Sequence, residues 1–561
     1  MSKCDYCDCE LDYTLSAVLV PKLRLGTQLQ ANRAERDSQK GGAFARRVGA
    51  EAPSKLCFGG WTPLVWGRAF WATELRGQAR FQTEFGNEGE EPPAVTRPSC
   101  RIEAMKKSTS LLTRLWRLSV FAVLFLVIVE GAIRKWVLPG FSELVYFAKD
   151  GVLLLAYGLF LLAPRERYEV RSFPGLGILL AVTAAWIVFD AFNVLLGSAI
   201  VGAFGVKCYL WYIPLLFLVP HLFENTNQIE RFLRRYLLLL IPVCLLGVAQ
   251  FFSPADSPIN RYAFMSDETN VVSFTDEEGR VRVTGTFAYI TGHATYLQVM
   301  AALLLTLFCL PLSTFWYVIG ICQYVLIIGN VLMSGSRGPA FLIVGMTIAF
   351  MASSVGRHST AMRRLRLALI ITVVAGGLGA AFMFREAFNA FMFRVETSAD
   401  TAERLKVVDV GSLDDALDAA GAGGFGAGAT QSGAAALRRI LSIPPMMKEP
   451  PAAEAEYIRV MLEIGPIGFL AWYGLRFYLL AALWVTWRDL RHPFLRQLGF
   501  AAMLIHLISL PQSLVINQTF GVYYWLFAGF IFLLPRLEEK EMERLRLRAA
   551  LTKLTASAAA D

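Results

Sequence analysis

The chain has 561 residues, of which 55% are hydrophobic and 18% are charged, and its formal net charge is +9. A soluble protein would carry about a quarter charged residues and far fewer long apolar runs. Its basic residues gather in short connectors between apolar runs, which argues against nucleic-acid binding and for a membrane protein.

Residues 1–104 differ from the rest of the chain. They have no sustained helical or strand period and no secretory signal pattern. The CxxCxC run at Cys4–Cys9 is not followed by cysteines at zinc-finger spacing, so no zinc site is expected there. Met105 precedes a basic stretch that suits the start of a first membrane span. We therefore expect residues 1–104 to be a disordered appendage or an artefact of the assigned gene start.

Residues 105–535 contain repeated windows of about 20 apolar residues, the length of a transmembrane helix. The predicted fold is all-α, a polytopic transmembrane bundle of about 12 spans with one large extracytoplasmic loop. The spans are expected near 117–134, 143–163, 174–193, 207–222, 236–252, 293–311, 315–333, 339–356, 367–384, 460–487, 498–514 and 519–535.

Charge in the connectors predicts the orientation of these spans. Basic residues dominate one set of alternating connectors, which should face the cytoplasm: 165–171, 224–236, 356–366, 488–497 and the charged tail 536–561. Both termini are then cytoplasmic, and the long intervals 253–292 and 385–457 face outward. The interval 385–457 is the large predicted loop.

The connector after the seventh predicted span reads LMSGSRGPAF and places Ser336 and Arg337 on the outer side. An arginine there can simply extend to lipid headgroups. Alternatively, Arg337 binds an anionic group, because it is always charged and can bind bidentately, and the following helix N-terminus also attracts phosphate. Arg282 lies ahead of the sixth predicted span on the same side.

The predicted outer loop contains Arg404 and ends in EAEYIRVMLEIG. Glu456, Arg459 and Glu463 recur there at i, i+3 and i+7, on one face of a helix that enters the membrane. They can form a structural charge network, or Glu454 or Glu456 can act in acid–base catalysis. The glycine-rich GAGGFGAGAT of the same loop can cradle phosphate or be merely flexible, and it matches neither nucleotide-loop signature.

Three of the polar residues in or next to the predicted spans are candidates for a specific role. Arg476 falls inside the tenth span, so it should face the interior of the bundle, and Asp150 on the second span is a candidate partner. His293 begins the sixth span, where a hydrogen-bonded structural role is the simpler interpretation. No further His or Cys lies at ligand spacing, so no metal site is predicted.

Four stretches together resemble the O-antigen ligase/polymerase superfamily of bacterial envelope-polysaccharide enzymes. In chain order they are RVTGTFAYITGHATYL, LMSGSRGPAF, the outer loop with TAERL and GGFGAGAT, and EAEYIRVMLEIGPIGFL. The resemblance covers roughly residues 105–535. It implies metal-independent and cofactor-independent glycosyl transfer at the outer face of the bacterial inner membrane, with a glycan on undecaprenyl diphosphate as donor and a glycan or glycolipid hydroxyl as acceptor.

The resemblance also assigns roles to residues. Arg337 and Arg404 match arginines of the family and would stabilise the departing diphosphate. Ligases have a His-Asn pair before the helix that ends the loop, whereas this chain has Glu454 and Ala455. Glu454 is therefore the candidate base, which favours a polymerase, or a ligase-like enzyme for an exopolysaccharide, over the lipid A–core ligase of lipopolysaccharide synthesis.

The predicted catalytic residues are thus Arg337, Arg404 and Glu454. Predicted substrate-binding residues are Ser336, Arg282, Glu456, Arg459 and Glu463. Other predicted partners are the lipid bilayer and a chain-length regulator or other polysaccharide-assembly proteins. The alternatives are an O-antigen ligase proper, a polysaccharide flippase or transporter, and a non-catalytic assembly subunit.

Overall fold

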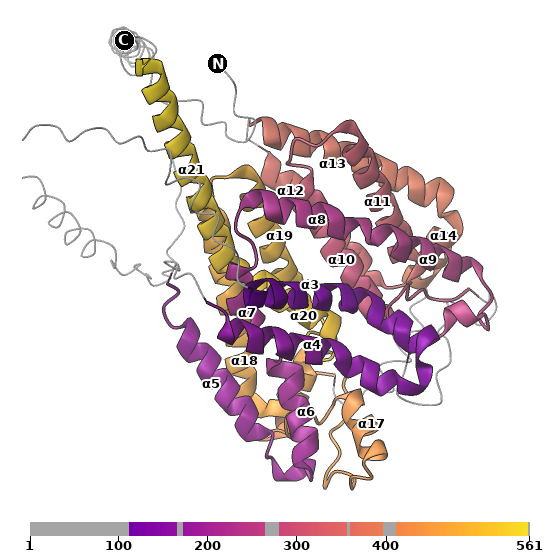
Figure 1. Cartoon of the computed structure of the whole chain (residues 1–561). Coiled ribbons are helices and arrows are strands. Elements are labelled where there is room, and N and C mark those ends of the chain that lie inside the picture. Colours follow the sequence, from indigo (N-terminus) through magenta and orange to yellow (C-terminus); the bar gives the residue numbers. More distant parts are fainter. Residues whose placement is uncertain (1–110, 165–171, 264–279, 356–358, 397–410, 559–561) are drawn as a thin grey trace, which may run out of the picture. The chain divides into compact units, whose positions relative to one another are not determined.

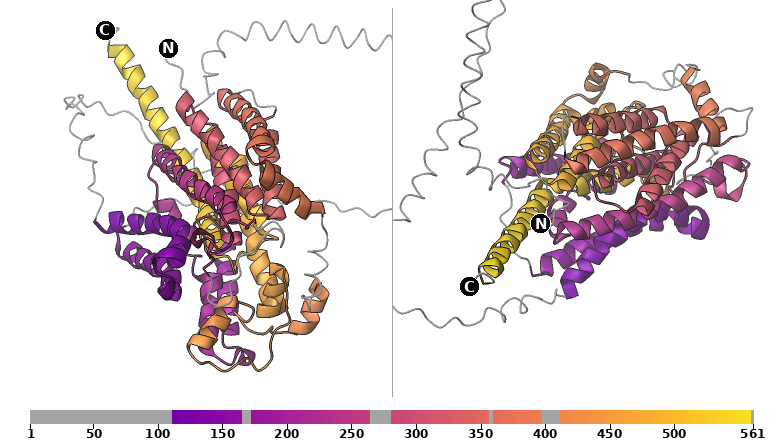
Figure 2. Two further views of the ribbon diagram at one scale, coloured as in Figure 1. Left: turned by 90° about the vertical axis from the view of Figure 1, so that its right-hand side faces the viewer. Right: turned by 90° about the horizontal axis from the view of Figure 1, so that it is seen from above.

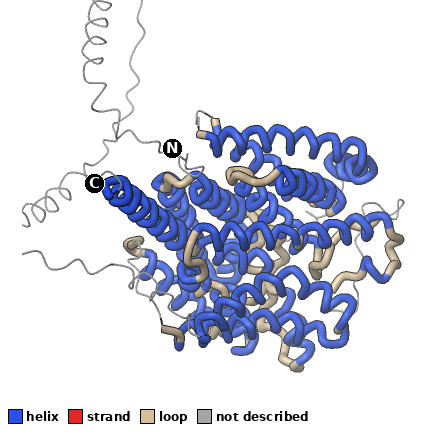
Figure 3. The backbone as a smooth tube through the Cα atoms, turned by 45° about the horizontal axis from the view of Figure 1, so that its top comes forward, coloured by secondary structure: helices blue, strands red, loops and turns tan. Residues whose placement is uncertain are grey.

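The computed structural model describes residues 111–164, 172–263, 280–355, 359–396 and 411–558. Helices are the regular elements of these ranges, and no strand occurs in them (Figure 1, Figure 3). The predicted all-helical fold is therefore confirmed for this part of the chain. The N-terminal extension 1–104 lies outside the described residues.

The first half of the described chain contains α-helices and short 3₁₀ or π segments, the latter labelled η. They are α3 (Leu111–Ala132), η3 (Ile133–Val137), η4 (Pro139–Phe141), α4 (Ser142–Leu162), α5 (Leu176–Asp190), η5 (Val194–Leu196), α6 (Ala199–Leu210), α7 (Leu215–Leu218), η6 (Val219–His221), α8 (Thr226–Leu238), α9 (Leu240–Phe252), η7 (Pro258–Asn260) and α10 (Ile290–Leu307).

The second half continues in the same way. Its elements are α11 (Thr314–Met333), α12 (Arg337–Ser354), α13 (Thr360–Leu378), η8 (Gly379–Met383), α14 (Arg385–Glu396), α16 (Leu413–Ala420), α17 (Ser432–Ile440), α18 (Glu456–Asp489), α19 (Pro493–Ser509), α20 (Gln518–Ala528) and α21 (Phe530–Ala558). The C-terminal part of α21 extends away from the other helices (Figure 2).

Local sequence sets several helix starts. Asn225, Ser359, Ser412 and Asn517 each accept a hydrogen bond from a backbone N–H in the first turn of the helix that follows. Short polar side chains suit this position because they satisfy N–H groups that have no partner within the helix.

Ten helical stretches are long and apolar enough to cross a membrane. They are Leu111–Val137, Pro139–Leu162, Ala199–His221, Thr226–Phe252, Ile290–Leu307, Thr314–Met333, Arg337–Ser354, Thr360–Met383, Glu456–Asp489 and Gln518–Thr552. The shorter apolar helices Leu176–Asp190 and Pro493–Ser509 coincide with the third and eleventh predicted spans. The protein is thus a multi-pass helical membrane protein.

The centre of the bundle is α10, in which nearly every residue is buried. It packs against α11, α12, α19 and α20, and its Tyr296 and Leu297 are fully inaccessible. Many helices around it expose Leu, Ile, Val and Phe side chains, as expected where a membrane protein meets lipid.

Connectors that lie far apart in the sequence meet at one end of the bundle, here called the loop-rich end. Lys135 bonds to Gly285 at 2.7 Å, Trp136 bonds to the Pro258 carbonyl at 2.9 Å, and Asn517 bonds to Thr295 at 2.9 Å. Opposite ends of the same helices are tied by other contacts, such as the 2.6 Å ion pair between Arg117 and Glu224.

The interval 385–457 is not one irregular loop. Within its described residues the chain forms α14, α16 and α17, and the segment 421–430 packs against α18. Segment 421–430 is ordered because it bonds to α18 where that helix breaks at Gly465.

Candidate functional site

The first group of predicted residues forms a fixed turn, here called the arginine turn, between α11 and α12. Arg282 is buried and donates from Nε to the Ser334 carbonyl at 2.9 Å and from Nη2 to Ser336 Oγ at 3.2 Å. Gly335 has a φ of 62°, a conformation that glycine adopts without strain. The structure thus brings together Arg282, Ser336 and Arg337, although 54 residues separate the first two.

Arg337 is placed where an anion would be attracted. It is the first residue of α12 and is only partly buried, and Ser336 occupies the N-cap position. The N-terminus of a helix carries a partial positive charge and backbone N–H groups without helical partners, which adds to the charge of the guanidinium.

The tenth predicted span is not a simple crossing helix. Within α18, Gly465 has φ 63° and ψ −178°, and Pro466 follows it, so the helix breaks there. Arg476 Nη1 lies 3.5 Å from Glu456 Oε1, although a straight helix would separate residues 20 positions apart by about 30 Å. The segment before Gly465 therefore folds back beside the segment after it, as a helical hairpin.

The helix break explains why the glycine-rich segment 421–430 is ordered. Pro466 has no N–H, so the Leu462 carbonyl loses its helical donor and accepts from Phe425 N–H at 2.8 Å instead. In the same way, the Glu463 carbonyl accepts from Gly426 N–H at 2.9 Å. These two N–H groups are thus used inside the protein and do not cradle a phosphate.

Glu463 fastens the end of this segment. Its Oε1 accepts from Thr430 N–H at 2.9 Å, from Thr430 Oγ at 2.7 Å and from Gln431 Nε2 at 3.3 Å. Its Oε2 accepts from Tyr209 Oη of α6 at 2.8 Å. The carboxylate is fully buried, and these bonds link the hairpin, the glycine-rich segment and α6.

Glu456 and Arg476 form a second buried unit of the hairpin. Both are almost inaccessible, and Glu456 Oε2 also accepts from Val515 N–H at 2.9 Å. The candidate pairing of Arg476 with Asp150 is not formed, because the guanidinium lies against Glu456 and the Ser509 carbonyl. Sequence could not identify Glu456 as the partner, since the reversal at Gly465 brings the two together.

The other predicted site residues lie apart from these contacts. Arg459 donates from Nε to the Ala453 carbonyl at 2.6 Å and so holds the chain just ahead of α18. Glu454 is exposed before the helix. Arg404 lies outside the described residues. His293 is completely buried in α10.

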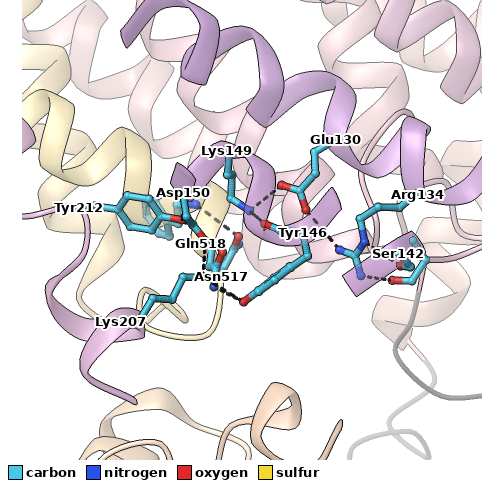
Figure 4. A network of polar contacts seen from close by, with 12 residues as sticks. Glu130, Arg134, Ser142, Tyr146, Lys149, Asp150, Lys207, Tyr212, Asn517 and Gln518 are labelled. Atoms are coloured by element: carbon cyan, nitrogen blue, oxygen red, sulfur yellow. Dashed lines mark hydrogen bonds and ion pairs between the residues drawn. The ribbon is translucent and has the colours of Figure 1, made fainter. Parts of the chain in front are cut away.

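A further polar group, of which the sequence analysis singled out only Asp150, consists of charged residues carried into the bundle by α3, η3, α4 and α6 (Figure 4). Lys149 Nζ lies 2.6 Å from Glu130, Arg134 lies 3.3 Å from Glu130, and Lys207 lies 2.8 Å from Asp150. The available signal was the presence of KD at 149–150 and of Lys207 inside apolar stretches.

These residues surround Tyr146 and are here called, together with Tyr146 and Lys135, the Tyr146 cluster. The cluster connects the arginine turn with the helical hairpin. Lys135 donates to Thr284 Oγ at 3.0 Å, two residues after Arg282 of the arginine turn. On its other side, Val515 in the connector between α19 and α20 is bound to Glu456, and Gln518, the first residue of α20, contacts Tyr146. The arginine turn, the helical hairpin and the Tyr146 cluster therefore share the loop-rich end.

No protein-family model matches this chain, and no curated protein matches it in sequence.

Proposed function

We propose that this protein transfers a glycan from a polyprenyl-diphosphate carrier, of the undecaprenyl type, to a hydroxyl of an acceptor glycan. The reaction takes place at the outer face of a bacterial inner membrane, both termini are cytoplasmic, and no metal or cofactor takes part. The proposal rests on the arginine turn, in which buried Arg282 holds Ser334 and Ser336 directly ahead of Arg337, the first residue of α12.

The chemistry requires fixed positive charge next to the leaving group. The acceptor oxygen bonds to the anomeric carbon, the bond from that carbon to the diphosphate oxygen breaks, and the diphosphate departs with the electron pair. Cationic groups that are already in position stabilise this developing charge without reorganisation. Arg337 serves this role in the proposal, assisted by Arg404, because an arginine remains protonated in any surroundings.

The proton of the acceptor hydroxyl must pass to a base. Glu454 is the proposed base because its carboxylate is exposed ahead of the hairpin and can therefore reach an acceptor from outside. Glu456 and Glu463 are less suited to this step, since both are buried and hydrogen-bonded within the protein.

The test is mass spectrometry of polyprenyl-diphosphate-linked glycans in a strain that lacks this gene. Single repeat units without long chains are expected for a polymerase, and long chains retained on the carrier are expected for a ligase. Accumulation should disappear with the wild-type gene and persist with Arg337→Ala. An Arg337→Lys variant keeps the charge but not the bidentate geometry, so partial recovery is expected.

Two results would contradict the proposal. Lipid-linked glycan that does not accumulate in the deletion strain would exclude transfer and leave transport or assembly. Full complementation by Arg337→Ala, at wild-type protein level, would exclude the arginine turn as the site of the chemistry.

A further inference from the structure

The Tyr146 cluster has more positive than negative charge. Arg134 and Lys149 share one carboxylate, Glu130, and Lys207 pairs with Asp150. Three cations therefore face two carboxylates. Lys135, next in the chain, adds a fourth basic side chain, which bonds to neutral acceptors, Thr284 Oγ and the Gly285 carbonyl.

The excess of positive charge is energetically costly because most of these basic side chains are buried. Arg134, Lys135 and Lys149 are only 6%, 2% and 3% exposed. Charges inside apolar helices are costly unless they are compensated, and such residues commonly mark binding sites. An uncompensated excess of one to two positive charges calls for an anion of matching charge.

The cations converge on one aromatic ring (Figure 4). The centroid of Tyr146 lies 4.4 Å from Lys207 Nζ, 4.6 Å from Lys149 Nζ and 5.4 Å from Arg134 Cζ. Tyr146 Oη accepts from Lys207 at 3.4 Å and from the Gln518 amide. Both bonds use the hydroxyl oxygen as acceptor, so its own O–H can donate to a ligand.

The cluster is also accessible and lies near the loop-rich end. Tyr146 and Lys207 are partly exposed, whereas Lys149 and Arg134 are buried. Lys149 lies about two helical turns, roughly 10 Å, from the end of α4 that faces the loop-rich end.

We infer that Arg134, Lys149 and Lys207, arranged around Tyr146, bind a phosphate-bearing lipid headgroup. Phosphate fits because a dianion balances the charge excess and its oxygens accept from lysine, arginine and tyrosine donors together. The diphosphate of a lipid carrier and the headgroup of an anionic phospholipid share this chemistry. The site does not depend on the proposed transfer reaction.

The test is a titration of the purified full chain in nanodiscs of zwitterionic lipid. Three probes are compared: inorganic pyrophosphate, a short-chain polyprenyl diphosphate and phosphatidylglycerol. The titrations use an Arg337→Ala background, so that anions bound at the arginine turn do not contribute. Thermal unfolding without probe reports whether each variant is folded.

Two variants address the cluster. Tyr146→Phe removes one oxygen and keeps the ring, and Lys207→Gln combined with Asp150→Asn removes an ion pair without leaving either charge unpaired. Each should weaken phosphate binding roughly tenfold or more, the effect of losing a bond to a charged group. Arg261→Gln, an exposed arginine in a connector of the same end, is the matched control and should bind like its parent.

The outcomes separate the sources of the phosphate. Affinity for both diphosphates but not for phosphatidylglycerol would assign the site to a lipid carrier, whereas affinity for phosphatidylglycerol as well would assign it to membrane phospholipid. Unchanged affinity in folded Tyr146→Phe would overturn the inference, and that variant decides the matter if the double variant does not fold. Binding without glycan transfer in the strain assay would refute the proposed function and leave this site standing.

Discussion

Replacing Glu463 by alanine tests how the glycine-rich segment 421–430 is held. The carboxylate accepts four hydrogen bonds, from Thr430 N–H, Thr430 Oγ, Gln431 and Tyr209. A buried donor that loses its acceptor costs about 1–3 kcal/mol. If only two of these donors stay unpaired, the variant loses about 2–6 kcal/mol, a large share of the 5–15 kcal/mol by which folded proteins are usually stable.

The matched control is Glu463→Gln. The amide keeps one oxygen for Thr430 and can turn its nitrogen toward Tyr209, where it donates to the hydroxyl oxygen instead of accepting from it. Most of the contacts therefore persist while the negative charge is removed. Bonds to a charged acceptor are roughly twice as strong as neutral ones, and a loss of about 1–2 kcal/mol is therefore expected. Stability should fall in the order wild type, Glu463→Gln, Glu463→Ala.

Two measurements check this order. Thermal unfolding of the purified protein in detergent should give the lowest midpoint for Glu463→Ala, and limited proteolysis should cleave segment 421–430 fastest in that variant. Equal midpoints and equal cleavage for the alanine and glutamine variants would refute the anchoring argument. If both variants were stable but failed to bind the glycan donor, the substrate-binding role predicted from the sequence would be supported instead.

Three further substitutions test the hairpin and the proposed base. Gly465→Ala places a Cβ 2.8 Å from the Ala422 carbonyl at a φ of 63°, so a loss of about 1–3 kcal/mol is expected in thermal unfolding, whereas Gly345→Ala, with no atom within 4 Å, should be neutral or slightly stabilising. Arg476→Met leaves Glu456 buried without its cation and should lower the free energy of unfolding by about 3–5 kcal/mol. Adding Glu456→Gln should restore part of this stability, and a double variant no more stable than Arg476→Met would argue against the ion pair. Glu454→Gln should abolish polymer formation without changing the amount of protein, and unchanged polymer would remove this residue as the base.

The sequence alone determined the class of the molecule. The length and apolarity of its runs predict membrane helices, because a backbone in lipid must satisfy its own hydrogen bonds. Ten long apolar helices and two shorter ones occupy the positions expected for spans. The end residues were less predictable; the first span, expected at 117–134, belongs to a helical stretch covering Leu111–Val137.

Part of the candidate site could also be predicted from the sequence. Ser336 and Arg337 stand out because an arginine in a connector predicted to face outward opposes the bias of basic residues toward the cytoplasmic side. That Arg282 would fix this turn was not predictable in detail, since its two bonds reach residues more than 50 positions away.

The helical hairpin could not be predicted from the sequence pattern alone. The Gly-Pro pair at 465–466 signals a break, but a break does not specify the angle between its two segments. The angle follows from contacts with other parts of the chain: the glycine-rich segment takes up the freed carbonyls, and Glu456 meets Arg476. The start of one apparent span therefore became a separate helical segment that folds back toward the rest of α18.

Only the tertiary structure could reveal the Tyr146 cluster. Its members lie on four elements between residues 130 and 207, together with Gln518 from the far end of the chain. Hydropathy specifies that a segment crosses the membrane, but it does not specify its rotation about its own axis or its neighbours. Those two properties decide which charges meet, because a charge in an apolar bundle is tolerated only where the packing of the helices brings it a partner.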